Sequence, residues 1–143
     1  MKKFILLSSI LLSLSANELY KEANCVSLLL GETSFDKNKM YDRSCVASLI
    51  TKNINAALLT DSMKMKIENL KTVTSEKDVV IYNYENKAIE ELSGKDIQSR
   101  IDYLCNNTSM KNNLLGNNLK LKIRYQLKDK IEVINVSNET CNK

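Results

Sequence analysis

The sequence predicts an α+β fold in which an N-terminal helical hairpin precedes an antiparallel sheet of about four strands packed against helices. Across residues 17–60, apolar residues recur at three- and four-residue intervals, which is typical of amphipathic helices. Across residues 63–141, two pairs of strand-like stretches are separated by one helical stretch, in the order ββαββ. Such a sheet is expected to carry its helices on one face.

The N-terminal residues have the pattern of a secretory signal peptide. Two lysines precede an apolar run over residues 4–12, and small residues follow this run. The run is shorter than the roughly 20 residues that cross a bilayer as a helix. We therefore expect residues 1–16 to be a leader, cleaved after Ser15 or Ala16. This leaves residues 17–143 as a single exported domain in the periplasm or, alternatively, outside the cell.

The mature chain is expected to carry no lipid anchor and little net charge. A lipoprotein has a cysteine directly after its apolar run, whereas the first cysteine here, Cys25, follows a polar stretch. The leader contains two of the lysines, so its removal lowers the formal net charge from +4 to +2, which favours no particular partner. We expect no stable membrane insertion after cleavage and no nucleic-acid partner.

The four cysteines are predicted to form disulfides, because an even cysteine count in a small exported chain is normally a disulfide framework. Four cysteines allow three pairings, and Cys25–Cys45 with Cys105–Cys141 is the economical choice. Each bridge would stabilise the fold by about 3 kcal/mol. A zinc or redox centre is disfavoured, because the chain has no closely spaced cysteine pair and no histidine. We expect no metal and no cofactor.

The first half of the chain contains two predicted helices joined by a polar loop. Residues 17–30 form the first helix, and Gly31 ends it. The second helix carries Cys45 on its apolar face and runs to about Leu59, where the polar residues 60–62 break the pattern. A bridge between Cys25 and Cys45 would hold this hairpin together.

The second half changes from helical to strand periodicity. The clearest strand covers residues 119–127, in which apolar residues alternate with lysine, arginine and glutamine. Ser93 and Gly94 introduce a helix that ends near Cys105. In chain order we expect a strand at 63–67, a turn at 75–78, a strand at 79–84, the helix with a short continuation at 110–115 before Gly116, the strand at 119–127, a turn at 128–130 and a strand at 131–136.

Several features of residues 63–141 match a known family. They are the hairpin ending in Tyr82-Asn83-Tyr84, the helix ending in Cys105 with residues 107–116 after it, the strand Lys122-Ile123-Arg124-Tyr125, and the terminal Cys141. This layout resembles small periplasmic proteins that include the α/β pilotins of type II secretion systems. The resemblance implies a compact sheet-and-helix domain, a Cys105–Cys141 bridge, and non-catalytic binding of a short helical segment of a secretin or another envelope protein. The chain lacks the lipid-accepting cysteine that is typical of pilotins.

An enzymatic function is not expected. The chain contains no histidine, which is the commonest general base, and no Gly-x-Ser-x-Gly nucleophile motif. The carboxylate pairs Glu90 with Glu91 and Glu68 with Glu85 could in principle exchange protons. We interpret them as solvated surface charges.

A basic stripe is the one charge pattern with a predicted geometry. It consists of Lys120, Lys122 and Arg124, and Lys64 and Lys66 could continue it on a neighbouring strand. Alternation places these residues on one face of a strand, with Tyr125 and Tyr82 as candidate aromatic neighbours. The stripe could bind an acidic polymer, lipid headgroups or an anionic partner. The favoured interpretation is the ordinary polar face of a two-layer sheet.

Taken together, these patterns predict an exported, non-enzymatic interaction module of the periplasm. A groove between helices and sheet would accept an amphipathic segment of another envelope or secretion-system protein. The alternative hypothesis is a secreted effector or inhibitor that acts outside the cell, a class whose members also tend to be small and disulfide-bonded.

Overall fold

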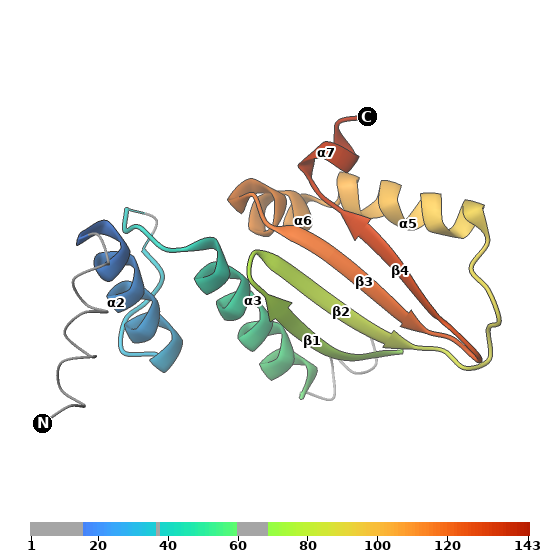
Figure 1. Cartoon of the computed structure of the whole chain (residues 1–143), viewed down its shortest axis with the longest axis horizontal. Helices are drawn as coiled ribbons and strands as arrows, with labels where there is room; N and C mark the ends of the chain where they lie inside the picture. Colours follow the sequence, from blue (N-terminus) through green and yellow to red (C-terminus); the bar gives the residue numbers. More distant parts are fainter. Residues whose placement is uncertain (1–15, 37, 60–68) are drawn as a thin grey trace, which may run out of the picture.

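The computed structural model describes residues 16–36, 38–59 and 69–143, and it confirms an α+β fold with a four-stranded sheet packed against helices (Figure 1). Two helices come first, and helical turns separate the first two strands from the last two. In chain order the elements are α2 (Ala16–Leu30), α3 (Arg43–Leu58), β1 (Leu70–Glu76), β2 (Val79–Glu85), α5 (Gly94–Asn106), α6 (Thr108–Asn113), the 3₁₀ turn η1 (Leu115–Asn117), β3 (Lys120–Gln126), β4 (Ile131–Val136) and α7 (Asn138–Cys141).

The strands lie in the order β1-β2-β3-β4, and the sheet is mixed. The outer pairs are antiparallel hairpins, but β2 and β3 run parallel, with Val79 opposite Lys120 and Glu85 opposite Gln126. The expectation of a sheet that is antiparallel throughout is therefore wrong at its centre. The cause is the connection through α5, α6 and η1, which returns the chain to the end of the sheet where β2 began. Such a crossover is what a parallel pair requires.

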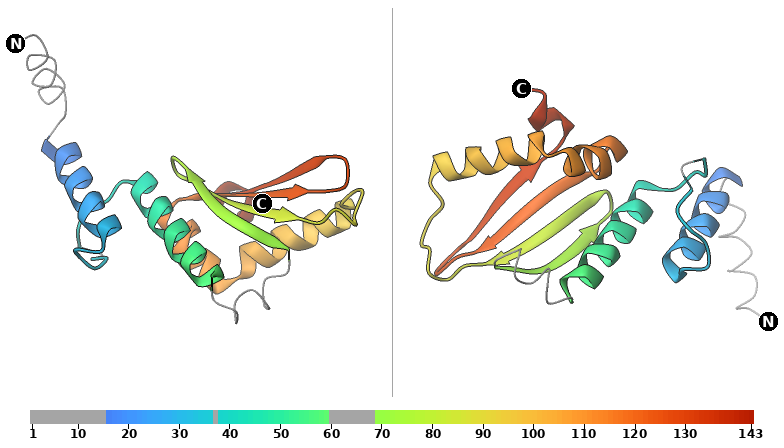
Figure 2. Two further views of the ribbon diagram at one scale, coloured as in Figure 1. Left: turned by 90° about the horizontal axis from the view of Figure 1, so that it is seen from below. Right: turned by 180° about the vertical axis from the view of Figure 1, so that it is seen from behind.

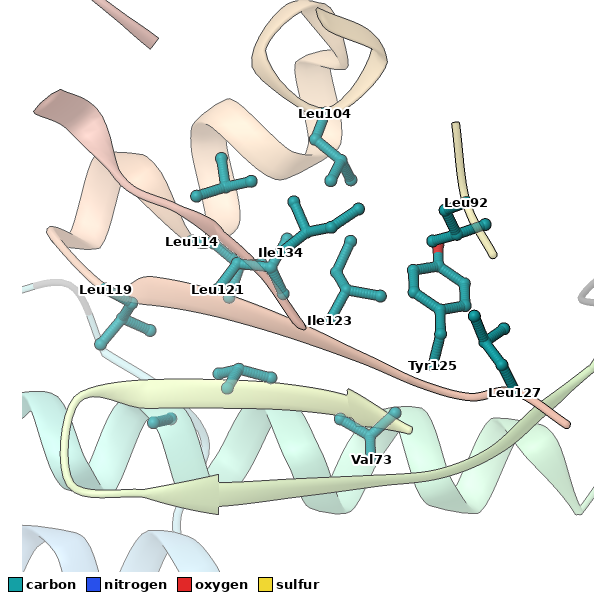
Figure 3. Packing of buried hydrophobic residues seen from close by; sticks show 13 residues of the cluster. Val73, Leu92, Leu104, Leu114, Leu119, Leu121, Ile123, Tyr125, Leu127 and Ile134 are labelled. Atoms are coloured by element: carbon teal, nitrogen blue, oxygen red, sulfur yellow. The ribbon is translucent and has the colours of Figure 1, made fainter. Parts of the chain in front are cut away.

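Helices α3, α5 and α6 lie on one face of the sheet, and no described helix covers the opposite face (Figure 2). Burial alternates accordingly along β3, where Leu121, Ile123 and Tyr125 are buried while Lys120 and Arg124 are exposed. Figure 3 shows the buried side chains converging between sheet and helices. The core consists of Ala47, Val73, Val80, Leu92, Leu104, Leu114, Leu119, Leu121, Ile123, Tyr125, Leu127, Ile134 and Val136.

The end of α2 and the start of α5 fall where the sequence predicts them, whereas the expected continuation at 110–115 is observed as α6 (Thr108–Asn113), with Gly116 inside η1. Gly31 follows α2 with φ +78°, a left-handed conformation that favours glycine. Ser93 caps α5, because its hydroxyl accepts a hydrogen bond from the Asp96 backbone N–H at 3.1 Å while the Asp96 carboxylate accepts one from the Ser93 N–H at 3.2 Å. A Cβ at Gly116 would lie 2.9 Å from the Lys111 carbonyl oxygen, so the turn after α6 also requires glycine.

The first strand differs from the sequence prediction. The predicted strand at 63–67 lies outside the described residues, and the partner of β2 is Leu70–Glu76, a stretch that sequence patterning leaves irregular. Only Val73 in this strand is fully buried, because β1 is an edge strand with little contact to the core. The turn to β2 at Lys77 and Asp78 falls within the predicted stretch.

Helix α3 covers the free edge of β1. The Asn55 side-chain amide donates to the Val73 carbonyl oxygen at 2.5 Å, and the Val73 backbone N–H donates to Asn55 Oδ1 at 2.9 Å. One side chain thus satisfies both backbone groups that an edge strand would otherwise leave unpaired. Farther along the strand, the hydroxyls of Ser48 and Ser75 lie 3.4 Å apart. These contacts fix the position of α3 against the sheet.

The disulfides join Cys25 to Cys45 and Cys105 to Cys141, the two pairs that the sequence favours. The first ties α2 to the first turn of α3, and the second ties the end of α5 to α7. None of the α2 side chains that the structure describes belongs to the main core, and α2 lies on the far side of α3 from the sheet (Figure 1). Besides its disulfide, α2 is held by the buried side chain of Leu28 and by two hydrogen bonds, from Lys52 Nζ to the Leu29 carbonyl oxygen and from the Asn24 side-chain amide to the Met40 carbonyl oxygen.

Asn55→Ala should lower the free energy of unfolding by about 1–3 kcal/mol, because it leaves two backbone groups of Val73 without protein partners. Asn53→Ala, an exposed position on the same helix, should change it by less than about 0.5 kcal/mol. Urea denaturation followed by circular dichroism measures both values. Equal effects of the two substitutions would contradict the role of Asn55.

The two disulfides should contribute unequally to the stability of the sheet. Cys105→Ala with Cys141→Ala should lower the free energy of unfolding by about 4 kcal/mol, because this bridge closes a long loop through the core. Cys25→Ala with Cys45→Ala should cost less than about 1 kcal/mol, because α2 can detach while the sheet stays folded. Denaturation followed by tyrosine fluorescence distinguishes the two. A larger loss for the Cys25–Cys45 pair would refute this division.

Candidate functional site

A groove of about 420 Å³ lies between α3, β2 and the turns of α6 and η1. Helix α3 forms one wall with Val46, Leu49, Ile50, Asn53 and Ile54. Their spacing of three and four residues places these side chains on one face of the helix. Val46, Ile50 and Ile54 also pack against the core, whereas Leu49 and Asn53 line the groove without belonging to the core cluster.

The remaining groove residues come from distant parts of the chain. Tyr82 projects from β2, and Phe35 comes from the loop between α2 and α3. The segment after α5 contributes Met110, Leu114 and Asn117. Phe35 is 50% exposed and stacks on Tyr41, with 5.1 Å between the ring centroids. The groove is thus lined mainly by apolar side chains.

Tyr82 places a polar group in this apolar groove. Burial of the ring, with a smaller contribution from neighbouring Tyr84, raises the pKa of Tyr82 to about 12. Its hydroxyl therefore stays neutral across the physiological pH range. Among the described residues it has no hydrogen-bond partner, so it is available to donate to or accept from a bound group.

The groove suits an apolar side chain or a short amphipathic segment. Its volume lies within the roughly 300–1,000 Å³ typical of binding pockets, and apolar walls with a few polar groups are characteristic of such sites. A helical ligand presents anchors at i, i+3, i+4 and i+7, and a hydrophobic groove accepts them. Asn53 and the Tyr82 hydroxyl could fix the orientation of the ligand.

The basic stripe lies on the uncovered face of the sheet, away from the groove. Lys120 forms an ion pair with Asp78 at 3.6 Å, whereas Lys122 and Arg124 have no ion-pair partner in the described part of the chain. Lys64 and Lys66 lie outside the described residues. The expected aromatic neighbours are wrong, because Tyr82 and Tyr125 face the helices. Successive strand residues point to opposite faces, so a tyrosine next to Arg124 in sequence cannot share its face.

The carboxylate pairs singled out in the sequence are engaged on the surface. Glu90 pairs with Lys128 at 2.8 Å and Glu91 with Lys130 at 3.5 Å. Glu85 pairs with Lys87, and Glu68 lies outside the described residues. Over residues 16–36, 38–59 and 69–143, no group of three histidine, cysteine, aspartate or glutamate side chains could hold a metal ion.

Sequence reasoning predicts a groove between helices and sheet but none of its residues. The α3 wall has a visible signal in the spacing of Val46, Leu49, Ile50 and Ile54. The opposite wall has none, because Met110 and its neighbours reach the groove only through the crossover between β2 and β3.

Comparisons with known proteins bear on the fold. No family model matches the chain, and no curated protein matches it by sequence. A solved structure, the pilotin EpsS of the Vibrio vulnificus type 2 secretion system, superposes with a TM-score of 0.53 at 16% sequence identity, covering 69% of this chain and 91% of the pilotin. The fold is similar to that of a type 2 secretion pilotin. The resemblance noted for residues 63–141 is therefore confirmed at the level of structure.

Among the residues that the structure describes, no helix is both long enough and apolar enough to span a bilayer.

Tyr82 should ionise about two pH units above an ordinary tyrosine. When phenolate formation is followed by ultraviolet absorbance as the pH rises, one tyrosine should titrate with a pKa of about 12. Tyr82→Phe should remove this part of the titration curve. Because the folded-state pKa is raised, the stabilising contribution is complete below about pH 10 and is lost as the pH rises to about 12. The loss of stability between these values should be shallower in Tyr82→Phe. Removal of a phase near pH 10 would show that Tyr82 is solvated.

Proposed function

We propose that this chain is an exported, pilotin-like interaction module of the bacterial envelope, whose groove binds an amphipathic segment of another envelope or secretion-system protein. The observation that carries this proposal is the apolar groove between α3, β2 and α6. The similarity of the fold to a type 2 secretion pilotin supports it. Two disulfides are consistent with export to an oxidising compartment, the periplasm, where residues 17–143 act as one domain.

Binding would be driven by burial of apolar side chains against α3 and Met110. Each aliphatic anchor that leaves water contributes roughly 1.5–3 kcal/mol before the entropy cost of ordering the segment. Leu49 is well placed to contact such an anchor, because it lines the groove but is not part of the core. The Tyr82 hydroxyl supplies a hydrogen bond that a correctly placed polar group of the partner would satisfy.

The proposed role is non-enzymatic. The chain has no histidine, and no described residue that lines the groove is a carboxylate or a lysine that could transfer a proton. Its lining instead has the character of a recognition surface, with a few neutral polar groups among aliphatic and aromatic side chains.

Site-specific photo-cross-linking in the periplasm tests this function. A photoreactive residue at Leu49 should capture one envelope partner, and mass spectrometry should map the link to an amphipathic segment. The same residue at Val133, which is 47% exposed on the uncovered face of the sheet, serves as the matched control and should not capture it.

Leu49→Lys should reduce recovery of this partner at least tenfold, because a charge in the groove must be desolvated when the segment binds. Val133→Lys should leave recovery unchanged. Equal capture from both positions, or no captured envelope protein while the fold is intact, would refute the proposal.

A further inference from the structure

A second cavity lies on the same helix-covered face, farther along β2. Its volume is about 220 Å³. The polar or aromatic side chains of Asn69, Tyr84, Asn86, Arg100 and Tyr125 line it together with the apolar side chains of Ile89, Leu92 and Leu127. The groove and this cavity share strand β2, because Tyr82 lines the first and Tyr84 the second. Two residues along a strand span roughly 7 Å, so a segment in the groove need extend only slightly to reach the second cavity.

Arg100 is held in a fixed orientation within this cavity. Its guanidinium carbon lies 4.8 Å from the centre of the Tyr125 ring, and its Nη1 donates a hydrogen bond to the Tyr125 hydroxyl at 2.8 Å. The Tyr125 ring in turn stacks on Tyr84, with 5.1 Å between centroids. Stacking on an aromatic ring pre-organises the planar guanidinium and leaves its other N–H groups free to donate.

Arg100 forms no ion pair within the described part of the chain, although its charge adds to the hydrogen bonds from Ser93 in lowering the pKa of Asp96. Asp96, one helical turn earlier, directs its carboxylate to the backbone N–H and hydroxyl of Ser93. A cation with free donors beside a cavity is a natural partner for an anion.

The other polar groups favour an anion of single charge. Burial raises the pKa of Tyr84, so its hydroxyl remains protonated, and among the described residues it has no hydrogen-bond partner. The side-chain amides of Asn69 and Asn86 also line the cavity and are neutral. One guanidinium in a cavity lined otherwise by neutral polar and apolar side chains matches the charge of a carboxylate better than that of a phosphate, which carries more negative charge at neutral pH.

We infer that Arg100 and Tyr84 form a carboxylate-binding site at the end of the groove, and that it takes a carboxylate of the partner segment. The identity of the partner rests on the proposed function, whereas the site itself rests on its own geometry. The carboxylate belongs either to the C-terminus of the segment or to an aspartate or glutamate side chain. Arg100 would contribute a bidentate contact and Tyr84 a further hydrogen bond.

Nuclear magnetic resonance of the ¹⁵N-labelled protein tests the site with small probes. N-acetylleucine presents an α-carboxylate, N-acetylglutamic acid α-amide presents a side-chain carboxylate, and N-acetylleucinamide presents neither. At least one carboxylate should produce saturable shifts of the Arg100 Nε–H signal, and the amide should not. The probe that binds more tightly shows whether the site prefers a C-terminal carboxylate or a side-chain carboxylate of the partner.

Substitutions make the assignment specific. Arg100→Gln should weaken carboxylate binding at least tenfold, and Tyr84→Phe should weaken it severalfold. Arg124→Gln, on the opposite face of the sheet, should have no effect and provides the matched control. Equal binding of the amide, unchanged binding in Arg100→Gln, or tighter binding of inorganic phosphate would overturn the inference.

The cross-link from Leu49 separates this inference from the proposed function. If the small carboxylates do not bind but the cross-link persists, the carboxylate site is wrong and the groove proposal stands. If they bind through Arg100 but the cross-link is absent, the site stands and its assignment to the groove's partner is wrong. If both hold, Arg100→Gln should reduce partner recovery at least tenfold while Arg124→Gln leaves it unchanged.

Discussion

The pair of hydrogen bonds between Asn55 and the backbone of Val73, together with the apolar face of α3 that packs on the core, holds α3 against β1, and the groove depends on that position. An edge strand needs partners for its outward-facing backbone groups, and α3 supplies them without adding a fifth strand. The helix is thereby held beside β1, where Leu49 and its neighbours line the groove together with Met110 and Tyr82. The same contact protects the sheet edge and builds one wall of the binding site.

The Cys105–Cys141 disulfide holds the wall of the groove that carries Met110, whereas Cys25–Cys45 attaches α2 to the start of the α3 wall. Cys45 directly precedes Val46 at the start of the α3 wall, and Cys105 lies in the last turn of α5, just before the helical turn that carries Met110. A groove whose walls are already fixed loses little conformational entropy when a segment binds. In a chain of 143 residues with a modest core, covalent bridges provide rigidity that packing alone would supply in a larger domain.

The sequence predicts local structure well because periodicity is a local property. The alternation along residues 119–127 places Leu121, Ile123 and Tyr125 in the core, and Ser93 with Gly94 marks the start of α5. The direction of β3 relative to β2 depends on where the crossover returns the chain, which the local pattern of two hairpins and a helix does not reveal. The groove and the Arg100 cavity could not be predicted, because their residues lie far apart in the sequence and come together only in the folded structure.

The most direct test is the hydrogen exchange of the Val73 backbone amide, followed residue by residue by nuclear magnetic resonance. The amide points to the outer edge of the sheet, where an unpaired N–H would exchange freely with water. If Asn55 binds the backbone of Val73 as described, the Val73 amide should exchange as slowly as the hydrogen-bonded amides between β2 and β3. Asn55→Ala should then make the exchange of the Val73 amide fast. Rapid exchange of Val73 in the intact protein would contradict the account.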